Sequence, residues 1–248
     1  MFLEGMTSEE IRKKLISDRK ELQKREFKIL KTGCKKALRG KSLFPYRCYE
    51  LLTTKNGNQY LMGIELNDAN AVISGRTAKS AKECKGLAFS KLVCVFRYKD
   101  GHYGGYHPNV ICPDYFVEMT YHFLLRYAER TNIIYNNEID IIKEYFNNNT
   151  CIVASNEYSD EELNNVKSEE RYYCSCRDGL IPMLIDEKRK INICLTFMDS
   201  DSLTKVKKKH DFDYNDRVNN LSTIMDKDSY EIIKRNNRTK YNAEEAIQ

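Results

Sequence analysis

The sequence of 248 residues contains no tryptophan and no long apolar run. No stretch approaches the roughly 18 consecutive apolar residues that a membrane-spanning helix requires, so the sequence predicts no membrane partner. The residues after Met1–Gly5 are polar, and the segment lacks the apolar core and cleavage site of a secretory signal. Together these absences predict a cytoplasmic protein.

Several motifs of common protein classes are also missing. The chain has no Gly-rich phosphate-binding loop and no GxSxG turn of a serine hydrolase. Its nine cysteines are scattered, and the two nearest, Cys174 and Cys176, lack the spacing and the second ligand pair of a zinc site. An odd number of cysteines without an export signal favours reduced thiols, and we expect neither a bound metal nor a cofactor.

The order of the predicted elements indicates an α+β fold. A long N-terminal helix is followed by an antiparallel sheet, then by two helices and a four-stranded antiparallel meander. This order suggests three parts, namely an N-terminal helix with a β-rich region (1–110), a second α+β unit (111–210) and a polar C-terminal tail (211–248).

Local signals place the elements of the first part. Thr7 and Glu10 have the spacing of a capping box, and the helix that follows should extend to about Leu38. The dipeptide Asn56-Gly57 predicts a β-hairpin. The strands flanking it are expected at 47–53 and 59–65, with a further strand at 92–98. A short helix is predicted at 78–85, and residues 102–108 contain too much glycine for regular structure.

The second part should begin with a helix from about Pro113 or Asp114 to Arg130. A second helix, capped by Asn136 or Asn137, is expected at 138–146. The predicted strands of the meander are 150–155, 171–176, 180–185 and 191–198. A last helix is predicted at 202–209.

Charge is distributed unevenly along the chain, whose net charge is only +5. The segment from Ile11 to Lys41 contains thirteen Lys or Arg and three acidic residues. Such a basic segment can lie along a phosphate backbone, or it can be an ordinary solvated helix face. The cluster that includes Lys207 and Lys208 allows the same two interpretations.

The segment from Tyr121 to Arg130 places His122, Arg126 and Arg130 four residues apart. On a helix this spacing forms one narrow polar stripe, while apolar residues fill most of the remaining circumference. The stripe should therefore lie at a core boundary, where its charges need a partner. An internal carboxylate or a bound phosphate would serve.

A His-x3-Arg-x3-Arg helix followed by an antiparallel meander with Thr196 in its last strand resembles the RelE, EndoU and colicin-like superfamily of small ribonucleases. The resemblance covers roughly residues 118–203 and is closest to an uncharacterised branch. It implies a metal-independent endoribonuclease, such as a toxin or phage effector, acting on RNA. It assigns catalysis to His122, Arg126, Arg130 and Thr196.

The chemistry of RNA cleavage fits these residue types. Histidine suits the proton transfers, and arginine stabilises the charge that develops on phosphoryl oxygens. Substrate contacts are predicted for Tyr172 and Tyr173, by base stacking, and for His107, Lys207 and Lys208. His102 and His107 could instead supply a second catalytic imidazole or, with His122, a metal site, although no acidic residue has a matching spacing.

A non-catalytic alternative uses the same residues differently. The arginines would then form ion pairs with internal acids, and His122 would be a structural histidine. The protein would be a phage or bacterial interaction or inhibitor protein. It would bind a nucleotide, nucleic acid or protein partner through a basic groove.

Overall fold

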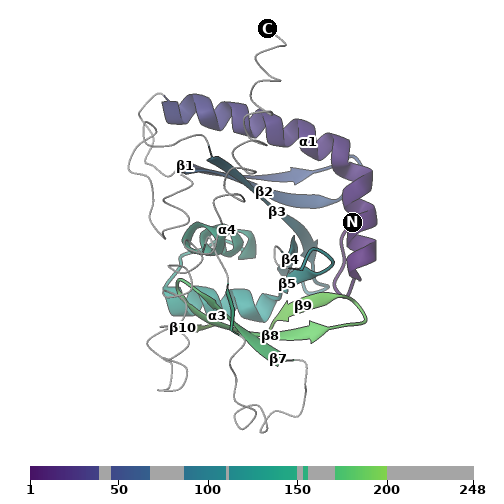
Figure 1. Cartoon of the computed structure of the whole chain (residues 1–248), viewed down its shortest axis with the longest axis vertical. Helices are drawn as coiled ribbons and strands as arrows, with labels where there is room; N and C mark the ends of the chain where they lie inside the picture. The colour runs from purple at the N-terminus through teal and green to yellow at the C-terminus, as the bar shows by residue number, and fades with distance from the viewer. Residues whose placement is uncertain (39–45, 68–86, 110–111, 150–152, 156–170, 200–248) are drawn as a thin grey trace, which may run out of the picture.

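The computed structural model describes residues 1–38, 46–67, 87–109, 112–149, 153–155 and 171–199 (Figure 1). The fold is α+β, with a long N-terminal helix, a large and mostly antiparallel sheet, and two helices in the middle of the chain. The helices predicted at 78–85 and 202–209, the tail 211–248 and the residues Lys207 and Lys208 lie outside the described residues.

The described helices are α1 (Ser8–Leu38), α3 (Tyr121–Thr131) and α4 (Glu138–Asn148). The first five strands are β1 (Tyr46–Thr53), β2 (Gln59–Asn67), β3 (Leu87–Arg97), β4 (Tyr103–Pro108) and β5 (Phe116–Met119). The remaining strands are β6 (Val153–Ser155), β7 (Arg171–Cys176), β8 (Gly179–Asp186), β9 (Ile191–Cys194) and β10 (Met198–Asp199).

All ten strands belong to one sheet, in the order β1-β2-β3-β4-β5-β9-β8-β7-β6, with β10 paired to β8. Neighbouring strands are antiparallel except β5 and β9, which are parallel. Strands β6 to β9 pair antiparallel in chain order, so the described strands confirm the predicted meander. The sheet of the N-terminal part and the meander are joined edge to edge through β5 and β9, rather than forming two separate sheets.

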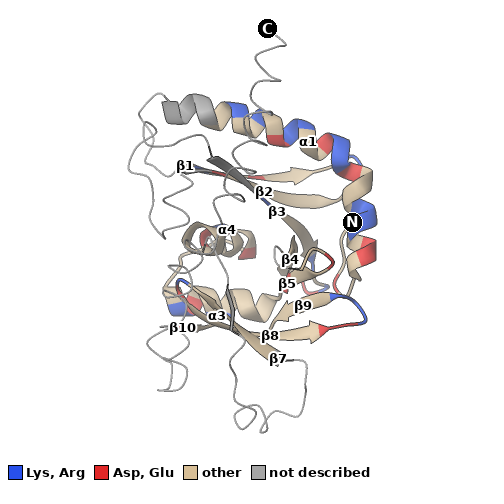
Figure 2. Cartoon of the chain, in the orientation of Figure 1, with Lys and Arg blue, Asp and Glu red and all other residues tan. Residues whose placement is uncertain are grey.

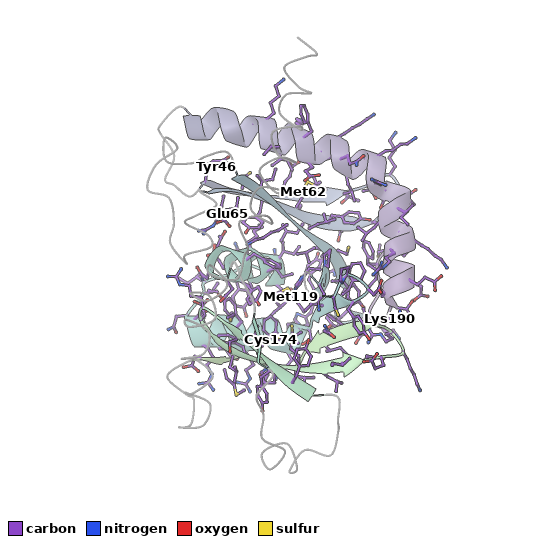
Figure 3. The ribbon with its side chains drawn as sticks, viewed as in Figure 1. Tyr46, Met62, Glu65, Met119, Cys174 and Lys190 are labelled. Atoms are coloured by element: carbon purple, nitrogen blue, oxygen red, sulfur yellow. The ribbon has the colours of Figure 1, made fainter. Side chains whose placement is uncertain are left out.

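The helices cover opposite faces of this sheet (Figure 1). Helix α1 packs through Ile11, Leu22 and Ile29 against one face, where Tyr60, Met62 and Phe96 are buried. Helices α3 and α4 pack against the other face in a second core. Figure 3 shows Met62 on the α1 side and Glu65 on the α4 side of the same strand, β2.

Two N-terminal predictions are confirmed. The capping box forms, with the backbone N–H of Thr7 donating to Oε2 of Glu10 at 2.8 Å and the N–H of Glu10 donating back to Oγ1 of Thr7 at 3.3 Å. The hairpin between β1 and β2 also forms. Gly57 has a φ of 74° in its turn, a left-handed conformation that costs glycine little. The cysteines at positions 48, 94, 112, 174, 176 and 194 are free thiols.

The predicted start of the first middle helix is wrong. Residues 116–119 form β5, a strand in the interior of the sheet whose four residues are all buried. Burial on both faces removes the alternation of exposed and buried residues that marks a strand, and here even Glu118 is buried, in an ion pair with Arg189, so periodicity cannot distinguish the segment from a buried helix. Helix α3 begins after Thr120, whose Oγ1 accepts the N–H of Phe123 as an N-cap.

The prediction of irregular structure at 102–108 is also wrong, because 103–108 form β4. A side chain at Gly104 would lie about 2.5 Å from the ring of Phe96, and one at Gly105 would lie as close to Val93. These glycines therefore allow close packing on both faces of the strand instead of breaking it.

The strand predicted at 191–198 divides into β9 and β10. The N–H of Leu195 still donates to the carbonyl of Pro182 on β8 at 2.9 Å. Proline has no N–H to return the second bond of that pair, so regular pairing ends there. Thr196 therefore lies between two strands rather than within one.

Candidate functional site

The predicted stripe on α3 forms and lies on the outer surface. His122, Arg126 and Arg130 are all exposed, whereas Phe123, Leu124, Tyr127 and Ala128 bury the opposite side of the helix. The expectation of a core boundary is therefore wrong. The buried stripe of α3 is narrow enough to leave all three polar side chains in solvent.

Both guanidinium groups of this stripe have carboxylate partners. Nη1 of Arg126 lies 2.8 Å from Oε2 of Glu129, and Nη1 of Arg130 lies 3.4 Å from Oδ1 of Asp199 on β10. Each arginine side chain is 46% exposed, so these pairs are solvated and contribute little to stability. Internal acids thus already provide the anionic partners that the spacing required.

Thr196 lies next to α3 but is not joined to the stripe. The segment that contains it follows the helix, because Oγ1 of Thr120 donates to the carbonyl of Cys194 at 2.8 Å and the ring of Phe197 packs on Tyr127 with centroids 4.9 Å apart. Within the described residues, no hydrogen bond links the Thr196 side chain to His122, Arg126 or Arg130.

The predicted substrate-binding residues are not gathered around the stripe. Tyr172 packs half-buried against the core beneath α3 and α4, while Tyr173 points to the other face of the sheet. His107 lies on β4, with its ring edge-on to Phe146 at 5.4 Å near the C-terminal end of α4. The pKa of His107 is lowered to about 4, chiefly by burial and also by the charge of Lys91, although the hydrogen bond to the carbonyl of Pro108 opposes the shift.

Helix α1 presents a different arrangement of charge, because two of its acids, Asp18 and Glu21, bind the β1–β2 hairpin. Asp18 is buried and accepts hydrogen bonds from the hairpin loop and β2. Its donors are Thr54 Oγ1 (3.0 Å), Asn56 Nδ2 (2.6 Å), Asn58 Nδ2 (2.7 Å) and Tyr60 Oη (2.7 Å). Burial alone would raise the pKa of Asp18, but these hydrogen bonds outweigh it and lower the pKa.

Glu21 also binds the hairpin loop, since its Oε2 accepts a hydrogen bond from the backbone N–H of Lys55 at 3.2 Å. The helix therefore uses acids to hold the β1–β2 hairpin, and this leaves its outward side basic. We call this side the α1 basic face. It consists of the exposed residues Arg19, Lys20, Lys24, Arg25, Lys28 and Lys31.

The α1 basic face carries six positive charges over about 18 Å of helix. None of the six forms an ion pair with any residue that the structure describes. Figure 2 shows blue segments along much of α1, with red segments between them. The charge count of residues 11–41 predicted such a surface, but the sequence did not reveal that Asp18 and Glu21 are turned away from it.

The fold and this surface define an α+β protein whose N-terminal helix covers one face of the sheet and carries the α1 basic face outward. No family model, curated protein or solved structure matches the chain. In the described ranges, no group of three or more His, Cys, Asp or Glu side chains could hold a metal ion. None of the described helices is both long and apolar enough to cross a membrane.

Proposed function

We propose that the protein is a nucleic-acid-binding protein that holds the phosphate backbone on the α1 basic face. The single observation that supports this most strongly is the set of six exposed cations that have no acidic partner in the part of the chain that the structure describes. Phosphodiester chains carry a dense row of negative charge, and each neutralised phosphate releases a counterion. Lysine and arginine at steps of three to five residues along a helix can contact several phosphates of one strand.

Nucleic acid fits this surface better than an anionic membrane does. An interfacial membrane helix inserts its apolar side into the bilayer. In α1 that side is occupied, because Ile11, Leu22 and Ile29 are buried against the sheet. Among the side chains of α1 that the structure describes, the exposed large apolar residues are Ile16 and Phe27, which are eleven positions apart.

This proposal corresponds to the non-catalytic alternative drawn from the sequence. The ribonuclease role of His122, Arg126, Arg130 and Thr196, and with it the resemblance to RelE, EndoU and colicin-like enzymes, stays a prediction. What weighs against it as the main proposal is that both arginines already contact carboxylates. A bound phosphate would have to compete with Glu129 and Asp199 for them.

Binding can be measured by fluorescence anisotropy with labelled 30-nucleotide probes, namely single-stranded RNA, duplex RNA and duplex DNA, between 50 and 300 mM salt. We expect binding whose logarithm falls linearly with the logarithm of salt concentration. The variant Lys20→Gln/Lys24→Gln/Lys31→Gln should bind more weakly. A matched control, Lys55→Gln/Lys99→Gln/Lys188→Gln, removes three equally exposed lysines outside α1 and should bind as the wild type does.

Two results would overturn the proposal. One is an absence of binding to all three probes at 50 mM salt. The other is equal weakening in the α1 variant and in the control, since that would reflect net charge rather than a surface. Binding to vesicles of anionic lipid with no binding to nucleic acid would assign the α1 basic face to a membrane instead.

A further inference from the structure

An exposed aromatic ring lies among the cations of the α1 basic face. Phe27 is 50% exposed, whereas Ile29, two positions further along the helix, is 6% exposed. Residues three, four and seven positions apart share one side of a helix, so Phe27 lies in one row with three lysines. These are Lys20, Lys24 and Lys31. The row is about 16 Å long and places the ring between two cations.

The face of the Phe27 ring has no partner in the described part of the chain. No aromatic ring described there stacks on Phe27, and no described cation lies over it. Other rings do have such partners, since the guanidinium of Arg12 lies 5.8 Å from the ring centroid of Phe116. Exposure of an apolar ring to water is unfavourable, so the row suits a ligand that covers the ring and also carries negative charge.

We propose that the α1 basic face binds single-stranded nucleic acid, with a base stacked on Phe27 and phosphates on the neighbouring lysines. This inference rests on the proposed function, which assigns phosphate binding to the same face. A single strand carries both groups that the row can bind, because its bases are flat and their faces are exposed. In a duplex the base faces are covered by neighbouring pairs, and only base edges are accessible in the grooves.

Two other occupants fit the row less well. A protein partner held by apolar contacts requires a larger apolar patch than one ring. Ile16, the other large apolar residue of α1 that is exposed among the described side chains, lies eleven positions away. That spacing separates the two side chains by about 16 Å along the helix. An acidic peptide would match the charge but would leave the ring without a stacking partner.

The first test compares a 30-nucleotide single-stranded DNA with its duplex in anisotropy titrations of the full chain at 100 mM salt. Phe27→Leu keeps an apolar side chain and removes the flat ring. F27L should bind the single strand about tenfold more weakly than wild type and the duplex within about threefold of wild type. Phe27→Tyr keeps a ring and should bind as wild type does. The control Ile16→Ala removes an exposed apolar side chain of the same helix and should also bind as wild type does.

The second test uses the absence of tryptophan from the chain. Phe27→Trp introduces a single indole, so its fluorescence reports on position 27 alone. The single strand should quench this fluorescence saturably, because a stacked base contacts the indole face, and the duplex should quench it weakly. The matched control Ile16→Trp should respond weakly to both probes. Equal quenching by the two probes, or at the two positions, would overturn the proposal, and this comparison decides the question if F27L unfolds in a thermal melt.

Salt dependence distinguishes failure of this proposal from failure of the proposed function. F27L retains all six cations, so its slope of log binding constant against log salt concentration should equal that of wild type. Lys20→Gln/Lys24→Gln/Lys31→Gln should have a smaller slope. If F27L binds the single strand as tightly as wild type while the lysine variant loses slope, base stacking is overturned and phosphate binding stands. An absence of binding to both probes at 50 mM salt would overturn both.

Discussion

Helices α1 and α3 both carry cations four residues apart on an exposed side, yet the two sets differ in their partners. On α3, Arg126 and Arg130 contact Glu129 and Asp199. On α1, Asp18 and Glu21 form hydrogen bonds to the β1–β2 hairpin. The outward cations have no acidic partner among the described residues. Residue spacing thus identifies a stripe, but the tertiary position of neighbouring acids decides whether that stripe can bind an external anion.

The sharpest way to break this comparison is to reverse charges on each helix. The variant Lys20→Glu/Lys24→Glu/Lys31→Glu should weaken binding to duplex RNA at 100 mM salt by about 1,000-fold or more, because three attractive contacts become repulsive. Arg126→Glu/Arg130→Glu should weaken it by less than about tenfold. Anisotropy titrations measure both effects. A larger effect from the α3 variant would show that nucleic acid binds to α3 and not to α1.

A second prediction concerns the acid that holds α1 against the sheet. Asp18→Asn should reduce the free energy of unfolding by about 2–4 kcal/mol, since the amide keeps only one of the two acceptor oxygens, places an NH2 donor against a group that already donates, and loses the charge. Urea denaturation followed by circular dichroism measures this change. As a control, Glu9→Gln removes an exposed acid of the same helix and should change stability by less than about 0.5 kcal/mol.

Asp18 also predicts a pH dependence. Its pKa is lowered in the folded state, so its contribution is present above the unfolded pKa of about 3.9 and is lost as pH falls further. Wild type should therefore lose stability below about pH 4, and D18N should lose less over that interval. Equal losses in the two proteins would contradict the assigned hydrogen bonds.

On the other face of the sheet, His107 predicts a loss of stability as pH falls from 7 to 5. In the unfolded chain it titrates near 6.5, whereas burial lowers its pKa to about 4 in the folded protein. The unfolded state binds more protons between these values, so stability should fall by about 1–2 kcal/mol from pH 7 to pH 5. Urea midpoints at the two values measure the loss, and His107→Phe should flatten it.

The smallest effects are expected at the α3 ion pairs. Arg126→Ala and Arg130→Ala should each change the free energy of unfolding by less than about 1 kcal/mol, because both pairs are solvated. A loss above 2 kcal/mol in either variant would show that the ion pair stabilises the fold more than a solvent-exposed pair normally does.

The sequence predicted local structure best where a short-range signal was present. The capping box at Thr7 and Glu10, the Asn56-Gly57 turn and the Asn137 cap of α4 all act over a few residues, and all are found in the structure. The polar stripe of α3 was likewise predicted from spacing alone.

Long-range pairing could not be predicted in the same way. Strand β5 resembles a helix segment because it is buried on both faces, and its parallel pairing with β9 joins residues more than 70 positions apart. The hydrogen bond between His102 and Glu138 also depends on tertiary structure. Gly104 and Gly105 were misread because the need for close packing is visible only once Phe96 and Val93 are placed.

The salt dependence of nucleic-acid binding tests the central claim most directly. For duplex RNA, removing three lysines of the α1 basic face (Lys20, Lys24 and Lys31) should reduce the slope of log binding constant against log salt concentration by about 2–3. The control that removes Lys55, Lys99 and Lys188 should leave the slope unchanged. An unchanged slope in the α1 variant would show that these lysines contact no phosphates and would contradict the account.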